Sequence, residues 1–173
     1  MKASPSNQVK VGILMGSASD IDVMHEAEKR LDYFGIPYET RILSAHRSPV
    51  QTLEYSDTAE RRGLQVIIVG AGAAAHLAGA VAAKTTLPVI GVPIDSSSLK
   101  GMDALLATVQ MPAGVPVATM AIGKAGAANA GIFAAQVIAR QDPRVAARLA
   151  QLKEELASSV EDKNRKLQSE RKK

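Results

Sequence analysis

The chain has 173 residues and no cysteine. This length fits one domain of roughly 100–200 residues, large enough to bury a core without disulfides or a structural metal. The lack of cysteine excludes thiolate catalysis, Cys-ligated zinc and iron–sulfur clusters, and it suits the reducing cytoplasm. There is no apolar leader and no uncharged apolar stretch of about 18 residues, so we expect a soluble, unexported protein without a membrane partner.

Charge and aromatic content argue against nucleic acid as a partner. The 21 basic and 17 acidic residues leave a net charge of +4, and six of the basic residues lie within residues 163–173. The body is therefore close to neutral. Aromatic residues make up 3% of the chain and tryptophan is absent, so the stacking platforms of single-strand binders are missing.

Five short apolar runs, rich in β-branched residues, alternate with helical patterns. The runs predicted as strands are residues 9–15, 38–45, 64–70, 87–92 and 115–122. The predicted helices are residues 20–34, 49–62, 74–85, 101–109 and 126–140. Near-continuous apolar strands separated by helices indicate a parallel sheet covered on both faces. The predicted class is α/β, a three-layer, Rossmann-like, doubly wound sheet of five parallel strands.

Local signals agree with these boundaries. Gly35 and Gly63 each follow a predicted helix as C-cap glycines, and Ser48-Pro49 reads as an N-cap followed by a first-turn proline. Ala73–Ala83 is apolar on all sides apart from one histidine, which predicts a helix buried all round. Residues 1–8 are expected to form a disordered arm, and residues 9–142 the folded, catalytic domain.

The segment 143–173 differs in kind from the rest. It predicts a long charged helix with one apolar stripe, whose members are spaced by four, three, four, four and seven residues: Val145, Leu149, Leu152, Leu156, Val160 and Leu167. Such a stripe must be covered. Two interpretations stay open with equal weight: the helix lies on its own core, or it packs on a neighbouring subunit.

Ligands of open parallel sheets bind outside the carboxyl ends of the strands, so the loops at those ends are the candidate ligand-binding segments. The first such loop places Ser17 and Asp20 at a helix start, where free N–H groups and the helix dipole favour a phosphate. The same two residues also match an S-x-x-D capping box, and from this loop alone structural capping is the favoured interpretation.

Nucleotide-cofactor motifs are not met. Gly70-Ala71-Gly72 follows the third strand and gives only part of GxGxxG, and no acid stands at the end of the next strand to hold a ribose. A tight turn would need these glycines whatever binds there. Gly123-Lys124 lacks the remaining residues of a P-loop.

The pair His46-Arg47 indicates a catalytic site more clearly than the glycine motifs indicate a nucleotide site. An imidazole beside a permanent cation at a strand's carboxyl end suits proton transfer on an anionic substrate. A lone histidine is more often structural than catalytic. His46 gains weight because hydroxyls, an acid, glycines and a second imidazole, His76, come from adjacent strand ends.

Six ordered blocks between residue 9 and about residue 150 resemble the PurE family, the bacterial N5-carboxyaminoimidazole ribonucleotide mutases of purine biosynthesis. The blocks are MGSASD (15–20), SAHRSP (44–49), GAGAAAHLAG (70–79), AAKTTLPVIGVP (82–93), QMPAGVPVAT (110–119) and AIGKAGAANAG (121–131). The resemblance implies a flavodoxin-like subunit, an octamer with active sites between subunits, and no metal or organic cofactor.

The resemblance also implies roles for individual residues. His46 would carry the proton, Ser17 and Arg47 would lie near the substrate phosphate, and Asp20 near the ribose hydroxyls. The base and carboxylate pocket would be lined by Ser44, Gly72, Ala73, His76 and Leu77. The chain departs from the family at Ala78, where a proline is usual, and at Ala80, where a larger methionine is common; the lost proline relaxes the turn beside the pocket.

The implied reaction moves a carboxylate from an exocyclic nitrogen to a ring carbon by loss and recapture of carbon dioxide. It needs a proton carrier, which an imidazole with a pKa near 6.5 can be, and a small dry pocket, for which Ala71–Ala75 and Gln110–Gly114 are the candidate loops. Two alternatives remain. One is direct carboxylation with free carbon dioxide, against which Arg47 argues; the other is a non-catalytic flavin- or nucleotide-binding module, which the few aromatics disfavour.

Overall fold

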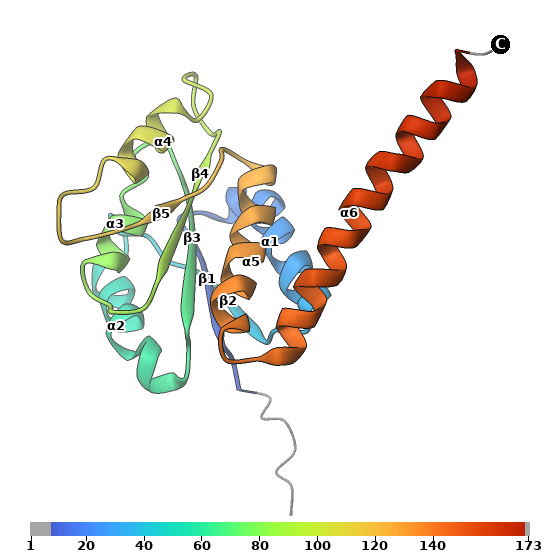
Figure 1. Cartoon of the computed structure of the whole chain (residues 1–173). Helices are drawn as coiled ribbons and strands as arrows, with labels where there is room; N and C mark the ends of the chain where they lie inside the picture. The colour runs from blue at the N-terminus through green and yellow to red at the C-terminus, as the bar shows by residue number, and fades with distance from the viewer. Residues whose placement is uncertain (1–7, 172–173) are drawn as a thin grey trace, which may run out of the picture.

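The computed structural model describes residues 8–171, and its centre is a five-stranded, all-parallel sheet. The strands are β1 (Val11–Met15), β2 (Tyr38–Ile42), β3 (Val66–Gly72), β4 (Val89–Ile94) and β5 (Ala118–Thr119). Their order across the sheet is β2-β1-β3-β4-β5 (Figure 1). This order is that of the flavodoxin-like doubly wound folds, and it confirms the predicted class.

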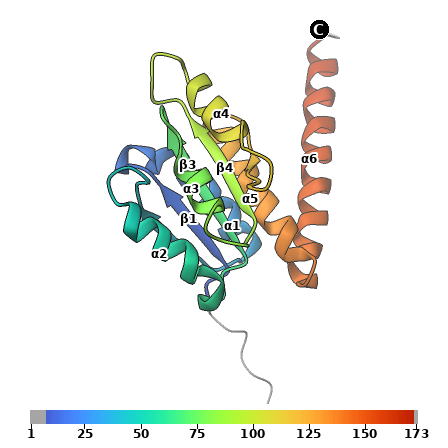
Figure 2. The ribbon, with the colours of Figure 1, turned by 90° about the vertical axis from the view of Figure 1, so that its left-hand side faces the viewer.

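Helices cover both faces of the sheet, as Figures 1 and 2 show. One face carries α1 (Ile21–Phe34), α5 (Lys124–Ala139) and the start of α6 (Pro143–Glu170), which contact one another. The other carries α2 (Pro49–Ala59), α3 (Leu77–Ala82) and α4 (Met102–Val109). Short 3₁₀ turns, Ala18–Asp20 and Glu60–Arg62, precede α1 and follow α2. Two apolar clusters, one on each face, form the core.

The central strands are buried on both faces, which explains why they read as unbroken apolar runs. Every residue of β1 and of β4 is buried, whereas the edge strand β2 is half-buried to exposed. The strand register brings buried apolar residues side by side: Ile13 lies beside Ile68 of β3, and Ile68 beside Ile90 of β4. Parallel strands between two helical layers lack a solvent face.

Two predicted elements are shorter than the sequence suggested. The strand predicted over 115–122 pairs only through Ala118 and Thr119, because Pro116 has no N–H to donate and the strand lies at the edge. The helix predicted over 74–85 begins only at Leu77. Ala73, just before the predicted start, has a left-handed φ of 51°, and the N–H groups of Ala75 and His76 donate to carbonyls two residues back, not four.

Burial of α3 is partial in the single chain. Leu77, Ala78 and Val81 are buried, but Gly79 and Ala80 are only half-buried in the single chain. Within one subunit only one face of this helix lies on the sheet, so its burial on every side, which would favour assembly, stays a prediction.

Caps follow the predictions except at one residue. Gly35 and Gly63 have left-handed φ values of 66° and 96° and end their helical segments, and Pro49 stands in the first turn of α2. Ser48 makes no side-chain cap. Its hydroxyl instead donates to the Ser44 carbonyl and accepts from the Ser44 N–H, at 3.2 and 2.9 Å, which closes the loop after β2.

The ends of the chain carry the remaining domain predictions. Residues 1–7 of the expected arm lie outside the described residues, while the Gln8 side chain donates to the Arg62 carbonyl at 3.3 Å. At the other end, α6 leaves the body and projects far beyond it (Figures 1 and 2). No helix among residues 8–171 is long and apolar enough to cross a membrane.

Candidate active site

The loops after β1, β2 and β3 meet at the carboxyl edge of the sheet. The strand order reverses there, because the chain passes from β1 to β2 on one side and then returns to place β3 on the other. Neighbouring crossovers thus diverge to opposite faces and leave a crevice between them. A cavity of about 430 Å³ occupies this position.

The first wall of the cavity is the turn that follows β1. Ser17 accepts a hydrogen bond from the Ser19 N–H at 3.3 Å, and Asp20 accepts one from the Ser17 N–H at 3.1 Å, so the predicted capping box is confirmed. Both side chains are also part of the cavity wall. Capping and lining of the pocket therefore coexist in the same residues.

Asp20 is the most buried charged group of this wall, with 4% of its surface exposed. Burial raises the pKa of Asp20 above its ordinary value, against the opposing effects of the Ser17 N–H, the Ser19 hydroxyl and the Arg47 charge. A carboxylate so placed gains from a ligand that brings hydroxyl donors, because those donors replace lost solvent.

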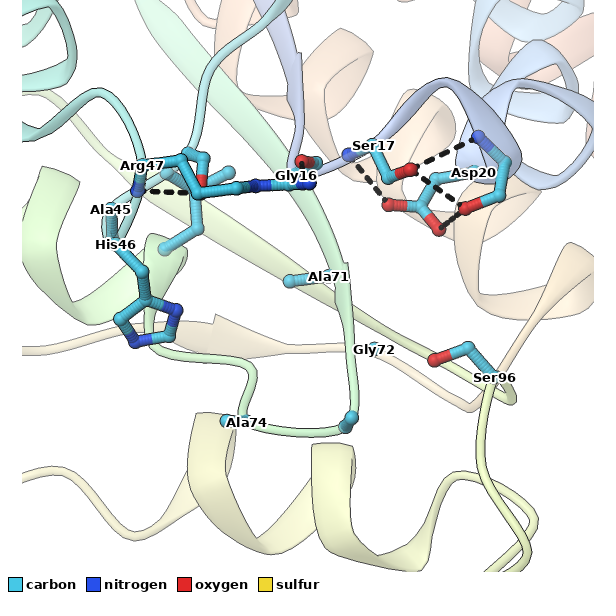
Figure 3. A pocket seen from close by; sticks show the side chains of 14 residues that line it. Gly16, Ser17, Asp20, Ala45, His46, Arg47, Ala71, Gly72, Ala74 and Ser96 are labelled. Atoms are coloured by element: carbon cyan, nitrogen blue, oxygen red, sulfur yellow. Dashed lines mark hydrogen bonds between the residues drawn. The ribbon is translucent and has the colours of Figure 1, made fainter.

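Arg47 joins the second loop to the first. Its guanidinium Nη2 donates to the Gly16 carbonyl at 2.8 Å, and its backbone N–H donates to the Ser44 hydroxyl at 3.1 Å (Figure 3). Arg47 and Ser17 both line the cavity. A guanidinium fork beside serine hydroxyls is well suited to bind a phosphate.

His46 and His76 form a pair across the second and third loops. Nε2 of His46 lies 2.9 Å from Nδ1 of His76, and the rings are nearly perpendicular, at 82°. His76 stands at the N-terminal end of α3, directly before Leu77. The contact needs one hydrogen between the two nitrogens, so the ring of His46 is held by a partner that can both donate and accept.

The structure brings all nine predicted site residues to this edge of the sheet. Eight of them line the cavity itself, and His76 reaches it through His46. Of the two loops expected to hold carbon dioxide, Ala71–Ala75 contributes most of its residues to the wall, whereas Gln110–Gly114 contributes none within this chain. The lining residues are Gly16, Ser17, Ser19, Asp20, Ser44, Ala45, His46, Arg47, Ala71, Gly72, Ala73, Ala74, Leu77 and Ser96.

Sequence reasoning missed Ser96, which reaches the cavity from the loop after β4 (Figure 3). The glycine at position 72 is the sequence feature connected with Ser96. Gly72 is the last residue of β3 and does not belong to the turn expected there. A Cβ on Gly72 would stand 1.9 Å from the Ser96 hydroxyl oxygen. The strand needs glycine at this position because the Ser96 side chain lies against its backbone.

Metal ligands are not gathered in the part of the chain that the structure describes: residues 8–171 hold no cluster of three or more His, Cys, Asp or Glu side chains able to bind an ion. The polar groups of the cavity are one guanidinium, one carboxylate, two imidazoles in contact, and several hydroxyls. They can bind an anion and move a proton.

A flavodoxin-like subunit with an imidazole and an anion site at its strand-order reversal defines a class of small-molecule enzymes. Residues 10–159 match the family model described as AIR carboxylase. The chain belongs to this family.

Individual relatives agree with the family model. The chain is 55% identical over 153 residues to the N5-carboxyaminoimidazole ribonucleotide mutase of Bacillus subtilis, which covers 88% of this chain and 94% of that protein. It is 48% identical over 163 residues to the mutase of Pyrococcus horikoshii, covering 94% and 91%. Among solved structures, Treponema denticola PurE superposes with a TM-score of 0.81 at 29% identity, covering 91% and 97%.

Proposed function

We propose that this chain is an N5-carboxyaminoimidazole ribonucleotide mutase of de novo purine synthesis, with His46 as its proton carrier. The activity is supported by family membership and by 55% identity to a mutase over nearly the whole of both chains. The observation that supports the role of His46 is its position on the wall of a cavity that also holds Arg47, Ser17 and Asp20.

The transfer of the carboxylate from nitrogen to carbon requires one proton carrier. When the bond between the exocyclic nitrogen and the carboxyl carbon breaks, carbon dioxide leaves and the nitrogen takes up a proton. The electron-rich ring carbon then attacks carbon dioxide and afterwards loses its own proton. The His46 imidazolium donates the first proton and its neutral form accepts the second, so the residue ends as it began and no electron sink is required.

The remaining polar residues anchor the nucleotide. Arg47 and the Ser17 turn bind the phosphate, and Asp20 accepts from the ribose hydroxyls. Carbon dioxide is held against the backbone of Gly72 and the small side chains of Ala73 and Ala74, with Ser44 and Leu77 closing the base pocket. These roles rest on the placement of the side chains around one cavity.

The assay that tests the proposal supplies each candidate substrate separately. We expect turnover of N5-carboxyaminoimidazole ribonucleotide to its carbon-carboxylated isomer, and no efficient carboxylation of aminoimidazole ribonucleotide with bicarbonate-derived carbon dioxide. Efficient carboxylation without the carboxyamino substrate would assign the chain to the direct carboxylases instead. A purified protein that carries bound flavin would favour a binding module.

We further propose that the chain assembles as a homo-octamer in the cytoplasm, and that within the C-terminal segment 143–173 the part of α6 beyond Leu152 lies against a neighbouring subunit. Support comes from an exposed apolar face on and just before α4, formed by Leu99, Met102, Leu106 and Val109. Residues at positions 102, 106 and 109 fall on one side of a helix, and such a face needs a cover. The half-buried side of α3 is a second surface of this kind.

A further inference from the structure

The apolar stripe of α6 continues past the point where the helix leaves its own subunit. Val145 and Leu152 are 4% and 6% exposed against the body, whereas Leu156, Val160 and Leu167 are 53%, 58% and 45% exposed. Val145, Leu156 and Leu167 are spaced by eleven residues, which is about three helical turns. The stripe therefore stays on one face of the helix from the core out into solvent.

Contacts of α6 with its own subunit end at Glu155. Arg148 donates to the Tyr33 carbonyl at 2.6 Å, and the Tyr33 hydroxyl donates to Glu155 at 3.1 Å. Every residue from Lys153 to Arg171 is exposed (Figure 1). An isolated helix of this length is marginal in water, so its apolar face needs a partner.

Charge divides this projecting segment into two equal blocks. Residues 154–162 contain four acids and no base, and residues 163–171 contain four bases and one acid. Two such helices side by side in parallel would place like charges together, whereas an antiparallel pair would place each acidic block on a basic one. The partner that fits this surface is a second copy of the same segment.

We propose that the projecting part of α6, residues 153–171, pairs antiparallel with the same segment of another subunit. Leu156 of one helix lies against Leu167 of the other, so the two-fold axis passes between residues 161 and 162. The boundary between the charge blocks lies between residues 162 and 163, one residue away. The apolar and the charged residues thus place the two-fold axis within one residue of each other by independent criteria.

This pairing goes beyond the proposed catalytic function. The family match ends at residue 159, so the basic block and Leu167 lie beyond the part of the chain that the family shares. The overlap of two short helices is small compared with a standard interface of about 1,600 Å². The contact therefore ties together subunits that other surfaces also hold.

Because the chain contains no cysteine, single introduced cysteines report the pairing directly. We would co-express Leu156→Cys and Leu167→Cys chains carrying different tags, oxidise the purified full-length protein gently, and measure the disulfide between the two tags. We expect this mixed disulfide in high yield and little disulfide when either variant is expressed alone. In the antiparallel pair, like positions are about 16 Å apart along the axis, too far for a bond.

The matched control uses Ser158→Cys and Ser169→Cys, which are also eleven residues apart but lie on the opposite side of the helix. This pair should give at least tenfold less mixed disulfide. Disulfide formation by Leu156→Cys chains alone would mean a parallel contact and would overturn the proposal. Equal yields from the two pairs, or none from either, would overturn it as well.

Charge reversal tests whether the acidic and basic blocks set the register of the two helices. In the crosslinking background, Lys163→Glu with Lys166→Glu places acids against the acidic block of the partner helix, and we expect the mixed disulfide to fall by roughly tenfold at low salt. Adding Glu161→Lys and Asp162→Lys returns bases to the neighbourhood of the new acids and should restore the parental yield. Failure of the second pair to restore it would show that the charges do not set the register. Mutase activity of the parent protein is measured in parallel, and its absence would bear on the proposed function alone.

Discussion

At the scale of single residues, the pair of imidazoles carries the most chemistry. His46 is the proposed proton carrier, and its Nε2 lies 2.9 Å from Nδ1 of His76. His46→Asn keeps a polar side chain of similar reach but cannot carry a proton near neutrality. We expect kcat to fall by roughly 10²–10⁴-fold, the range lost with a general acid–base group, while substrate binding by calorimetry changes little. A near-normal rate would remove His46 from the mechanism.

His76 is expected to act by orienting His46. His76→Asn retains an amide that can donate or accept near the position of Nδ1, whereas His76→Phe keeps the ring shape without that group. We predict that the asparagine variant retains much more kcat than the phenylalanine variant, and that only the latter alters the pH profile of kcat. Higher kcat in the phenylalanine variant than in the asparagine variant would mean that His76 acts by ring shape alone, and equal losses would contradict an orienting hydrogen bond.

Gly126 illustrates a residue whose identity is set by a close approach within the fold. A Cβ there would stand 1.6 Å from the Ala121 carbonyl oxygen, a backbone atom that cannot rotate away. Gly126→Ala should lower the free energy of unfolding by about 2–3 kcal/mol, a typical cost of overpacking. Gly79→Ala is the control, since its Cβ would meet only the flexible end of Met111 at 3.2 Å. Chemical denaturation of both variants checks the difference.

At the scale of elements, the start of α6 is fixed by charge. Asp142 caps the helix by accepting from the Arg144 N–H at 3.1 Å, and its carboxylate also contacts the Arg144 side chain and Lys10, the latter at 3.3 Å. Hydrogen bonds from Arg144 and Lys10 lower the pKa of Asp142 to about 2, although partial burial opposes the shift. The ionised carboxylate therefore stabilises the folded chain.

The sign of the pH dependence follows from that shift. A folded pKa of about 2, below the ordinary value of 3.8 for an aspartate, gives stability that is present above pH 4 and is lost as the pH falls toward 2. Asp142→Asn keeps the cap but removes the charge. We expect it to lower the free energy of unfolding by on the order of 1 kcal/mol at pH 7, because the pair is partly exposed, and by much less at pH 2, where most of that stability is already lost. Urea unfolding at both pH values tests this; an equal loss at pH 2 would contradict it.

At the scale of the whole molecule, the exposed apolar face beside α4 is the surface most directly tied to assembly. Leu106 is 50% exposed at its centre. Leu106→Lys should convert the proposed octamer to smaller species in sedimentation, because a charge would be buried between subunits. Ser158→Lys adds the same charge on the outer side of α6 and should leave the octamer intact. A monomeric parent protein, or an unchanged octamer in Leu106→Lys, would reject α4 as an interface.

The sequence by itself determined the elements and the loops that carry the site. Apolar runs between helical patterns indicated five parallel strands, because burial on both faces leaves no alternation to read. The residues at the strand ends, His46 and Arg47 above all, could be placed at one edge of the sheet because parallel strands share their direction. The resemblance of six motifs supplied the family before any geometry was known.

Other features depended on contacts between distant segments. The hydrogen bond from Arg47 to Gly16, the contact between the two histidines, and the entry of Ser96 into the cavity each join residues from different loops. The short α3 followed from the backbone of Ala73, and the role of Gly72 from the Ser96 side chain beside it. Local pattern fixes which face of an element is buried, but only packing in three dimensions brings particular atoms within hydrogen-bond distance.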